Sequence, residues 1–215
     1  TKTYARFGLR ERDWLEHVLI AGMSGAGKTN LVLQILNELR RHRKPFLVFD
    51  WKRNYRDLLE RPDFAHLTVF TVGRSIQPFH FNPLLPPTGV SPGEWLMKLV
   101  DVIKHAYFVG DGVEYALRRA IDLVYETCKF HDGQPVETPT FQAVRNFVLQ
   151  QRLQGRMALW RASALRVLES LCFRHGLGPV VNTPANDFDK LLANDIIIEL
   201  DTLADADKVF LTEAI

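Results

Sequence analysis

Short runs of aliphatic, β-branched and aromatic residues mark the predicted strands of this chain. They are residues 18–21 (VLIA), 46–50 (FLVFD), 66–72 (HLTVFTV) and 195–201 (DIIIELD). Continuous apolar runs of this length are typical of strands that are buried on both faces, as in a parallel sheet. The pattern therefore predicts a parallel sheet that is flanked by helices.

Helical periodicity follows the first of these runs. Residues 30–42 place apolar side chains on one face of a helix, and these are Leu31, Ile35, Leu36 and Leu39. Basic residues end this helix and Pro45 breaks it. Residues 17–50 are thus expected to form a β–loop–α–β unit, which calls for parallel strands and a right-handed crossover.

Four more helices are predicted with no strand between them. Their ranges are 94–107, 111–129, 139–153 and 157–173. Ser91, Pro92 and Glu94 have the spacing of a capping box at the start of the first. The expected N-caps of the next two are Asp111 and Thr138, and the aromatic residues expected to pack rather than bind are Trp95, Tyr107, Tyr115 and Phe141. This block predicts an α-helical insertion in an α/β fold.

Composition limits the class of protein. The chain has 215 residues, 47% of them hydrophobic and 24% charged, which is ordinary for a globular protein. No apolar stretch approaches the roughly 20 residues that span a bilayer. Cys128 and Cys172 are far apart without CxxC spacing, so we expect core thiols and a cytoplasmic location.

Charge is spread unevenly along the chain. The net charge is +2, but residues 1–110 carry 16 Lys and Arg against 10 Asp and Glu, whereas the remainder carries 11 against 15. Such asymmetry weakly favours a polyanion near the first half. Basic residues cluster near residues 40–56, namely Arg40, Arg41, Arg43, Lys44, Lys52, Arg53 and Arg56. They either contact phosphate or a neighbouring subunit, or form a solvated helix end.

Residues 22–29 (GMSGAGKT) fit the pattern GxxxxGK[ST], with a predicted strand before and a helix after. Glycines let the backbone wrap a phosphate, and the N–H groups of the loop and of the helix N-terminus point at it. Lys28 should reach the β- and γ-phosphates of ATP, and Thr29 should bind Mg²⁺. The expected nucleotide-binding residues are Gly22, Met23, Ser24, Gly25, Ala26, Gly27, Lys28, Thr29 and Asn30.

Other motifs narrow the reaction. No NKxD, DxxG or LSGGQ-like stretch occurs, which argues against a small GTPase and an ABC ATPase. Asp50 ends a predicted strand at the sheet edge where ligands bind, so it either orients Mg²⁺ or water as a catalytic residue or caps the strand end. Glu199 is a second candidate acid in a predicted strand; it either acts as the catalytic base or has another role.

Several stretches together resemble the HerA/FtsK superfamily of P-loop ATPases, most closely its HerA-like branch. They are EHVLIAGMSGAGKTN, PFLVFDWKRNYRDLL, FHFNPLL and RASALRVLESLCFRHGLGPV followed by DIIIELDTL. The resemblance implies a RecA-like ATPase domain that binds ATP and Mg²⁺, assembles as a hexameric ring and moves duplex DNA, with a nuclease or effector as a partner. Relatives that act on protein in type IV secretion or conjugation are the alternative, and a small-molecule kinase is a third.

The resemblance also assigns roles and boundaries. Where relatives commonly have a glutamate, this chain has Asn54. By the same alignment Glu199 is not the base, and the true Walker B motif lies beyond Ile215, so the chain is expected to bind ATP with Mg²⁺ but hydrolyse it poorly. Residues 1–83 are then the first part of the ATPase core, 84–175 the helical insertion and 176–215 the return to the core. The residues considered for a trans-acting arginine are Arg161, Arg166 and Arg174.

Overall fold

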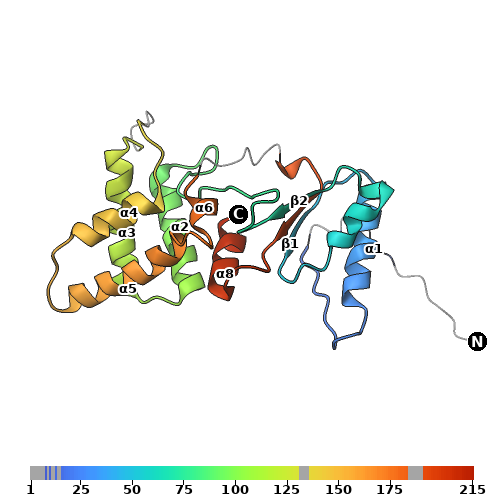
Figure 1. Cartoon of the computed structure of the whole chain (residues 1–215), viewed down its shortest axis with the longest axis horizontal. Coiled ribbons are helices and arrows are strands. Elements are labelled where there is room, and N and C mark those ends of the chain that lie inside the picture. Colours follow the sequence, from blue (N-terminus) through green and yellow to red (C-terminus); the bar gives the residue numbers. More distant parts are fainter. Residues whose placement is uncertain (1–7, 9, 11–12, 14–15, 131–135, 184–190) are drawn as a thin grey trace, which may run out of the picture. The chain divides into compact units, whose positions relative to one another are not determined.

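The computed structural model describes residues 8, 10, 13, 16–130, 136–183 and 191–215 (Figure 1). The chain divides into two compact units, Thr1–Arg43 and Lys44–Ile215. The first unit carries the glycine-rich loop and one helix, and the second carries the sheet and the remaining helices.

In the first unit, helix α1 (Lys28–Arg41) begins directly after the glycine-rich loop, as expected. Leu36 of its predicted apolar face is buried, but Leu31 is 45% exposed. Residues 18–21 form no strand, contrary to the prediction, and Leu19 is 90% exposed. The physical reason is that a strand needs a partner for its backbone groups, and the described part of this unit offers none.

The second unit contains a three-stranded parallel sheet. Its strands are β1 (Leu47–Asp50), β2 (Thr68–Thr71) and β3 (Ile196–Glu199). The spatial order is β1–β3–β2, so the last strand in sequence lies in the centre. Asp50, Thr71 and Glu199 occupy one row at the carboxyl ends of the strands. Three of the four predicted strands are therefore confirmed, and so is the α/β class.

The second unit also contains the remaining helices. Their bounds are η2 (Arg56–Glu60), η3 (Pro62–Phe64), α2 (Pro92–Tyr107), α3 (Asp111–Thr127), α4 (Phe141–Gln150), α5 (Arg156–Leu171), α6 (Gly178–Val181) and α8 (Asp205–Ala214). Helices α2 to α5 pack on one another and α8 packs on α2, and Figure 1 shows them gathered on one side of the sheet. The four consecutive helices predicted from periodicity are confirmed.

The caps of these helices agree only in part with the sequence. Ser91 caps α2, because its Oγ accepts a hydrogen bond of 3.2 Å from the backbone N–H of Glu94. The expected N-caps of the next two helices are wrong: Gly110 precedes α3, and Thr140 caps α4 through the N–H of Ala143. In the second case a threonine two residues later takes the capping role.

One hydrophobic core joins the sheet to the helices. It contains Phe70 and Ile198 from the strands together with residues of α2, α3, α4, α5 and α8. Of the aromatic residues expected to pack, Phe141 is fully buried, but Tyr115 is 41% exposed on α3, which corrects that prediction. The boundaries predicted at residues 84 and 175 remain a prediction.

The Asn-Pro-Leu stretch forms a clasp between the sheet and the helices. Asn82 is buried, its Nδ2 donates to the carbonyl of Pro139 at 2.9 Å, and its Oδ1 accepts from the N–H of Leu84 at 3.0 Å. Trp95 and Tyr125 donate to the next carbonyls, those of Pro83 and Leu84. The motif thus has a structural role, and it fixes the extended segment that follows β2.

Both cysteines are free. Burial raises the pKa of the Cys172 thiol to about 11, and it also raises the pKa of Cys128. Thiols that stay protonated at neutral pH are poor nucleophiles, so both residues behave as packing residues.

Candidate functional site

The loop of residues 22–29 has the backbone of a phosphate cradle. Gly25 and Gly27 have φ angles of 79° and 86°, which only glycine adopts without strain, and Gly27 is the N-cap of α1. Apart from the adjoining residues, no atom of the described part of the chain lies within 4 Å of the place where a Cβ would stand at either residue, so the space beside the loop is open. The first turn of α1 contains no acidic residue, which leaves its N-terminal N–H groups available to an anion.

Lys28 is the first residue of α1 and turns back over the loop. Its Nζ donates hydrogen bonds of 2.8 Å to the carbonyl oxygens of Gly22 and Met23. Among the described residues, this ammonium bonds to these two carbonyl oxygens and to no carboxylate. A cation held by two neutral carbonyls at the mouth of an N–H-lined loop fits the β- and γ-phosphates of a nucleoside triphosphate. Thr29 follows on α1, with Asn30 exposed beside it.

Asp50 caps the end of β1. It is 1% exposed, and its carboxylate accepts the backbone N–H groups of Lys52 at 3.2 Å and of Tyr55 at 3.0 Å. This is the strand-end cap that the sequence left open as one alternative. The carboxylate also raises the pKa of the Tyr55 hydroxyl, after the larger effect of burial.

Glu199 lies at the end of β3 and is engaged by arginine. It is fully buried, and Arg56 binds it bidentately, with Nε to Oε1 at 2.9 Å and Nη2 to Oε2 at 2.6 Å. Arg74 and Arg53 lie 3.5 Å and 3.9 Å from the same carboxylate. Both oxygens are therefore occupied, which is unfavourable for a residue that must take a proton from water.

Asp201 extends this cluster by two residues. Arg74 binds it with Nη1 to Oδ1 at 3.0 Å and Nη2 to Oδ2 at 2.6 Å. These hydrogen bonds lower the pKa of Asp201 below its ordinary value of 3.8 and raise the pKa of Arg74. Sequence reasoning assigned no role to Arg74, and it included Asp201 only as the last residue of the predicted strand 195–201. The available signal was that both stand at the carboxyl ends of predicted strands, and parallel strands end at one edge.

We compared the chain with known protein families and solved structures. Residues 6–108 match the family model DUF87, described as the central domain of helicase HerA. This match covers just under half of the chain and supports its resemblance to the HerA/FtsK superfamily of P-loop ATPases. VirB4 of Thermoanaerobacter pseudethanolicus has a similar fold, with a TM-score of 0.59 over 86% of this chain and 72% of that protein at 14% identity. No curated protein matches the chain in sequence.

The fold of this chain is the RecA-like one that the resemblance implied. The roles of individual residues stay predictions, including those of Lys28, Thr29, Asp50 and Glu199. Among the described residues, no helix combines the length and apolar character that crossing a membrane requires.

The three arginines considered for a trans-acting role have different surroundings. Arg161 donates to the carbonyls of Val148 and Leu149 at the end of α4, so it serves the helix terminus. Arg166 donates to Ser163 one turn away on α5. Arg174 is exposed in the segment after α5. Of the basic residues near 40–56, Arg41 pairs with Glu38 and Arg56 with Glu199, so neither is a purely solvated cation.

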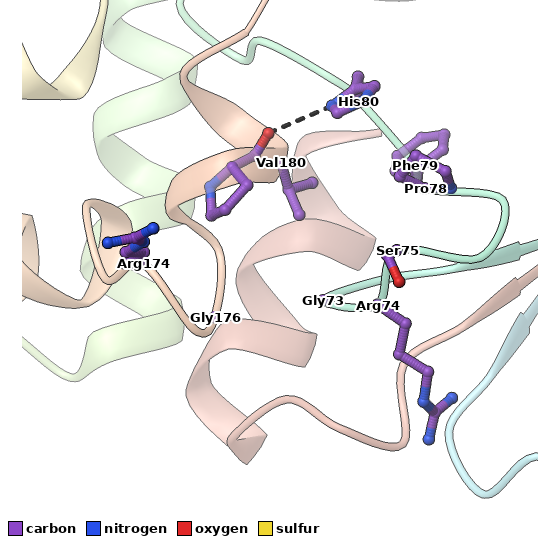
Figure 2. Close-up of a pocket in the computed structure, with 10 residues that line it drawn as sticks. Gly73, Arg74, Ser75, Pro78, Phe79, His80, Arg174, Gly176 and Val180 are labelled. Atoms are coloured by element: carbon purple, nitrogen blue, oxygen red, sulfur yellow. Dashed lines mark hydrogen bonds between the residues drawn. The ribbon is translucent and has the colours of Figure 1, made fainter.

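A cavity of ≈ 300 Å³ lies beside the turn that follows β2. Figure 2 shows its lining, with Ser75 and His80 on one side and Arg174 and Gly176 on the other. His80 is held by the carbonyl of Pro179 at 3.2 Å. The Arg74 side chain extends away from His80, because its guanidinium is bound to Asp201. The guanidinium of Arg74 therefore lies with Asp201 at the carboxyl end of the sheet, and not in the cavity beside His80.

Proposed function

We propose that this chain is the ATP-binding motor domain of a hexameric HerA-like ATPase that couples ATP hydrolysis to the translocation or processing of duplex DNA. The observation that supports it most is the glycine-rich loop, with positive φ angles at Gly25 and Gly27 and with Lys28 turned over it. The family match is to a domain described as the central domain of helicase HerA, which is consistent with a DNA substrate.

The residues of the loop fit a nucleotide. We assign the cradle to the backbone N–H groups of residues 22–29, charge neutralisation to Lys28 and a hydroxyl ligand for Mg²⁺ to Thr29. ATP bound with Mg²⁺ supplies the phosphoanhydride bond whose hydrolysis drives movement. A catalytic or metal-binding role of Asp50 stays a prediction, and two backbone hydrogen bonds keep its carboxylate fixed.

DNA binding in this proposal is electrostatic. A ring that encloses duplex DNA contacts mainly phosphates, so binding is sensitive to salt and indifferent to sequence. The excess of Lys and Arg in residues 1–110 supports this assignment. A nuclease or other effector would act with the ring on the same DNA. The alternative is a secretion or conjugation ATPase that acts on protein.

The test is to measure the size of the intact protein with ATP, and its ATPase rate with and without duplex DNA. We expect a hexamer whose turnover rises with DNA and falls again as salt increases. Lys28→Ala is the inactive control, and Lys98→Ala, which removes a surface ion pair on α2, is the matched neutral control. A ring with normal turnover but no response to DNA would favour a protein substrate. A monomer that phosphorylates a metabolite would overturn the proposal.

A further inference from the structure

The proposed function leaves the cavity beside the turn after β2 without a role. This cavity of ≈ 300 Å³ lies entirely within the second unit. Its first wall is the turn of residues 73–80, and its second wall is the segment of residues 174–180 (Figure 2). The two walls are far apart in the sequence, so the cavity exists only because the fold brings them together.

Backbone hydrogen bonds hold the first wall in place. The N–H of Thr71 donates to the carbonyl of Gln77 at 3.0 Å and closes the turn. The N–H of Phe81, directly after the turn, donates to the carbonyl of Val180 at 3.0 Å. This second bond ties the first wall to the second wall and fixes the distance between them.

The second wall is a tight turn that requires glycine. The N–H groups of Gly176 and Gly178 both donate to the carbonyl of Phe173, at 3.1 Å and 3.0 Å. A Cβ at Gly178 would lie 2.7 Å from the carbonyl oxygens of Cys172 and Phe173, so a larger residue does not fit there. Because both walls are fixed before anything binds, the cavity spends little conformational entropy on a ligand.

Most of the cavity is lined by apolar side chains. They are Pro78, Phe79, Pro179 and Val180. Its volume is at the lower end of the roughly 300–1,000 Å³ of ligand pockets, which suits one large side chain. Apolar surface continues outside the cavity, because Ile76 beside the first wall is 76% exposed and Phe173 beside the second wall is 55% exposed. Exposed apolar side chains that adjoin a cavity are typical of a site for another protein.

The second wall also carries a positive charge. Arg174 lines the cavity and is exposed, and within the described part of the chain no carboxylate forms an ion pair with it. By contrast, Arg145 pairs with Glu169. A cation without an acidic partner beside an apolar cavity is complementary to a ligand that combines an apolar group with a carboxylate.

We propose that this cavity docks a short segment of a partner protein, with an aromatic side chain in the cavity and a neighbouring carboxylate paired with Arg174. The occupant is a peptide and not a free small molecule, because Ile76 and Phe173 extend the apolar surface beyond the volume that one side chain fills. The inference goes beyond the proposed function, since docking at this cavity needs neither ATP nor DNA.

Defined peptides test the inference in the intact protein without nucleotide. The probe is the amidated peptide Gly-Asp-Trp-Asp-Gly with a fluorescent dye at its N-terminus, and its matched control has asparagine in place of both aspartates. Fluorescence anisotropy measures the two affinities. We expect saturable binding of both peptides, with the aspartate peptide bound about two- to fivefold more tightly, as expected for one exposed ion pair.

Variants of the two walls locate the bound peptide. Ser75→Trp, at an exposed position of the lining, fills the cavity and should weaken both peptides by about tenfold or more. Arg174→Gln should abolish the preference for the aspartate peptide and leave the affinity for the asparagine peptide unchanged. Arg166→Gln removes the same charge from an exposed position on α5 outside the lining, and it should bind both peptides as the wild type does. If Ser75→Trp has a lowered melting temperature, Arg174→Gln decides alone.

Four results would overturn the inference. The first is the absence of saturable binding of the aspartate peptide to the wild type. The second is an unchanged affinity in a folded Ser75→Trp, which would place the peptide elsewhere. The third is a preference for aspartate that survives Arg174→Gln or disappears in Arg166→Gln. The fourth is displacement of the peptide by free indole-3-propionate with an affinity equal to that of the peptide, which would make the ligand a small aromatic acid and not a partner protein.

Discussion

Asp50 and Glu199 are direct neighbours in the register of β1 and β3, yet their carboxylates bind different kinds of donor. Asp50 accepts two backbone N–H groups of its own loop, whereas Glu199 accepts the guanidinium of Arg56 from 143 residues away. One acid therefore shapes a local turn and the other joins distant segments. Their substitution should have different consequences.

Replacement of Asp50 should destabilise the second unit. Asp50→Ala leaves the N–H groups of Lys52 and Tyr55 without their acceptor, and the free energy of unfolding should fall by about 1–3 kcal/mol. Urea unfolding followed by circular dichroism measures this. Asp57→Ala, at an exposed position in η2, is the matched control and should stay within about 0.5 kcal/mol of the wild type. Equal stability of the two variants would contradict the cap.

Lys28 should be needed for nucleotide binding but not for folding. Within the described part of the chain, the Lys28 Nζ donates to the carbonyls of Gly22 and Met23 in its own loop. Removal of the Lys28 side chain therefore leaves the fold intact. We expect Lys28→Ala to weaken ATP binding by about 10- to 100-fold, the loss of one or two charge-assisted hydrogen bonds. Fluorescence titration with a labelled ATP analogue measures the affinity. An unchanged affinity for ATP would show that Lys28 and its loop do not bind the nucleotide.

The side chain of Asn82 should contribute strongly to the stability of the second unit. Asn82→Ala removes two buried hydrogen bonds and leaves the carbonyl of Pro139 and the N–H of Leu84 unsatisfied. The free energy of unfolding should fall by about 2–4 kcal/mol. Asn54→Ala, at an exposed asparagine, is the control.

The ion pair between Arg74 and Asp201 should make the free energy of unfolding depend on pH in the acidic range. The pKa of Asp201 is lowered in the folded state, so its contribution is present above the ordinary value of 3.8 and disappears as the pH falls through the lowered pKa. Unfolding midpoints in urea, measured from neutral pH down to about pH 2, should therefore differ between wild type and Asp201→Asn at neutral pH and converge in acid. A constant difference over this range would contradict the assignment.

The 215-residue chain by itself should bind ATP with Mg²⁺ but hydrolyse it slowly. The reason is that Glu199 is fully buried with both oxygens bound by Arg56, which leaves it unsuited to activate water. Release of phosphate from ATP measures the rate, and Lys28→Ala gives the background. Rapid, Lys28-dependent turnover by this chain would restore Glu199 as a candidate base.

The sequence predicted the elements that depend on local pattern. Ile196, Ile197 and Ile198 form a continuous apolar run, and a run of this kind is buried whichever neighbours it receives. Ser91 with Glu94 identified the start of α2 for the same reason, since a cap acts within one turn. Residues 18–21 have the same composition as a strand, but strand formation also needs a partner, which composition does not specify.

The charged cluster could not be predicted in the same way. The sequence placed Arg56 among basic residues near a helix end, whereas its partner is Glu199. Only the order β1–β3–β2 brings the segment after β1 next to the end of β3. Arg74 was overlooked because a single arginine after a strand carries no pattern of its own. Pairings between distant segments depend on the topology, whereas the pattern of a helix or of a buried apolar run is local.

The central place of β3 has a consequence for biosynthesis. While the chain emerges from the ribosome, β1 and β2 have been made but cannot pair with each other, because the strand that separates them comes more than a hundred residues later. The helical segments can form in the meantime, since their contacts are local. The nascent protein therefore carries two unpaired strands for most of its synthesis, and it should depend on chaperones more than a domain whose neighbouring strands follow one another.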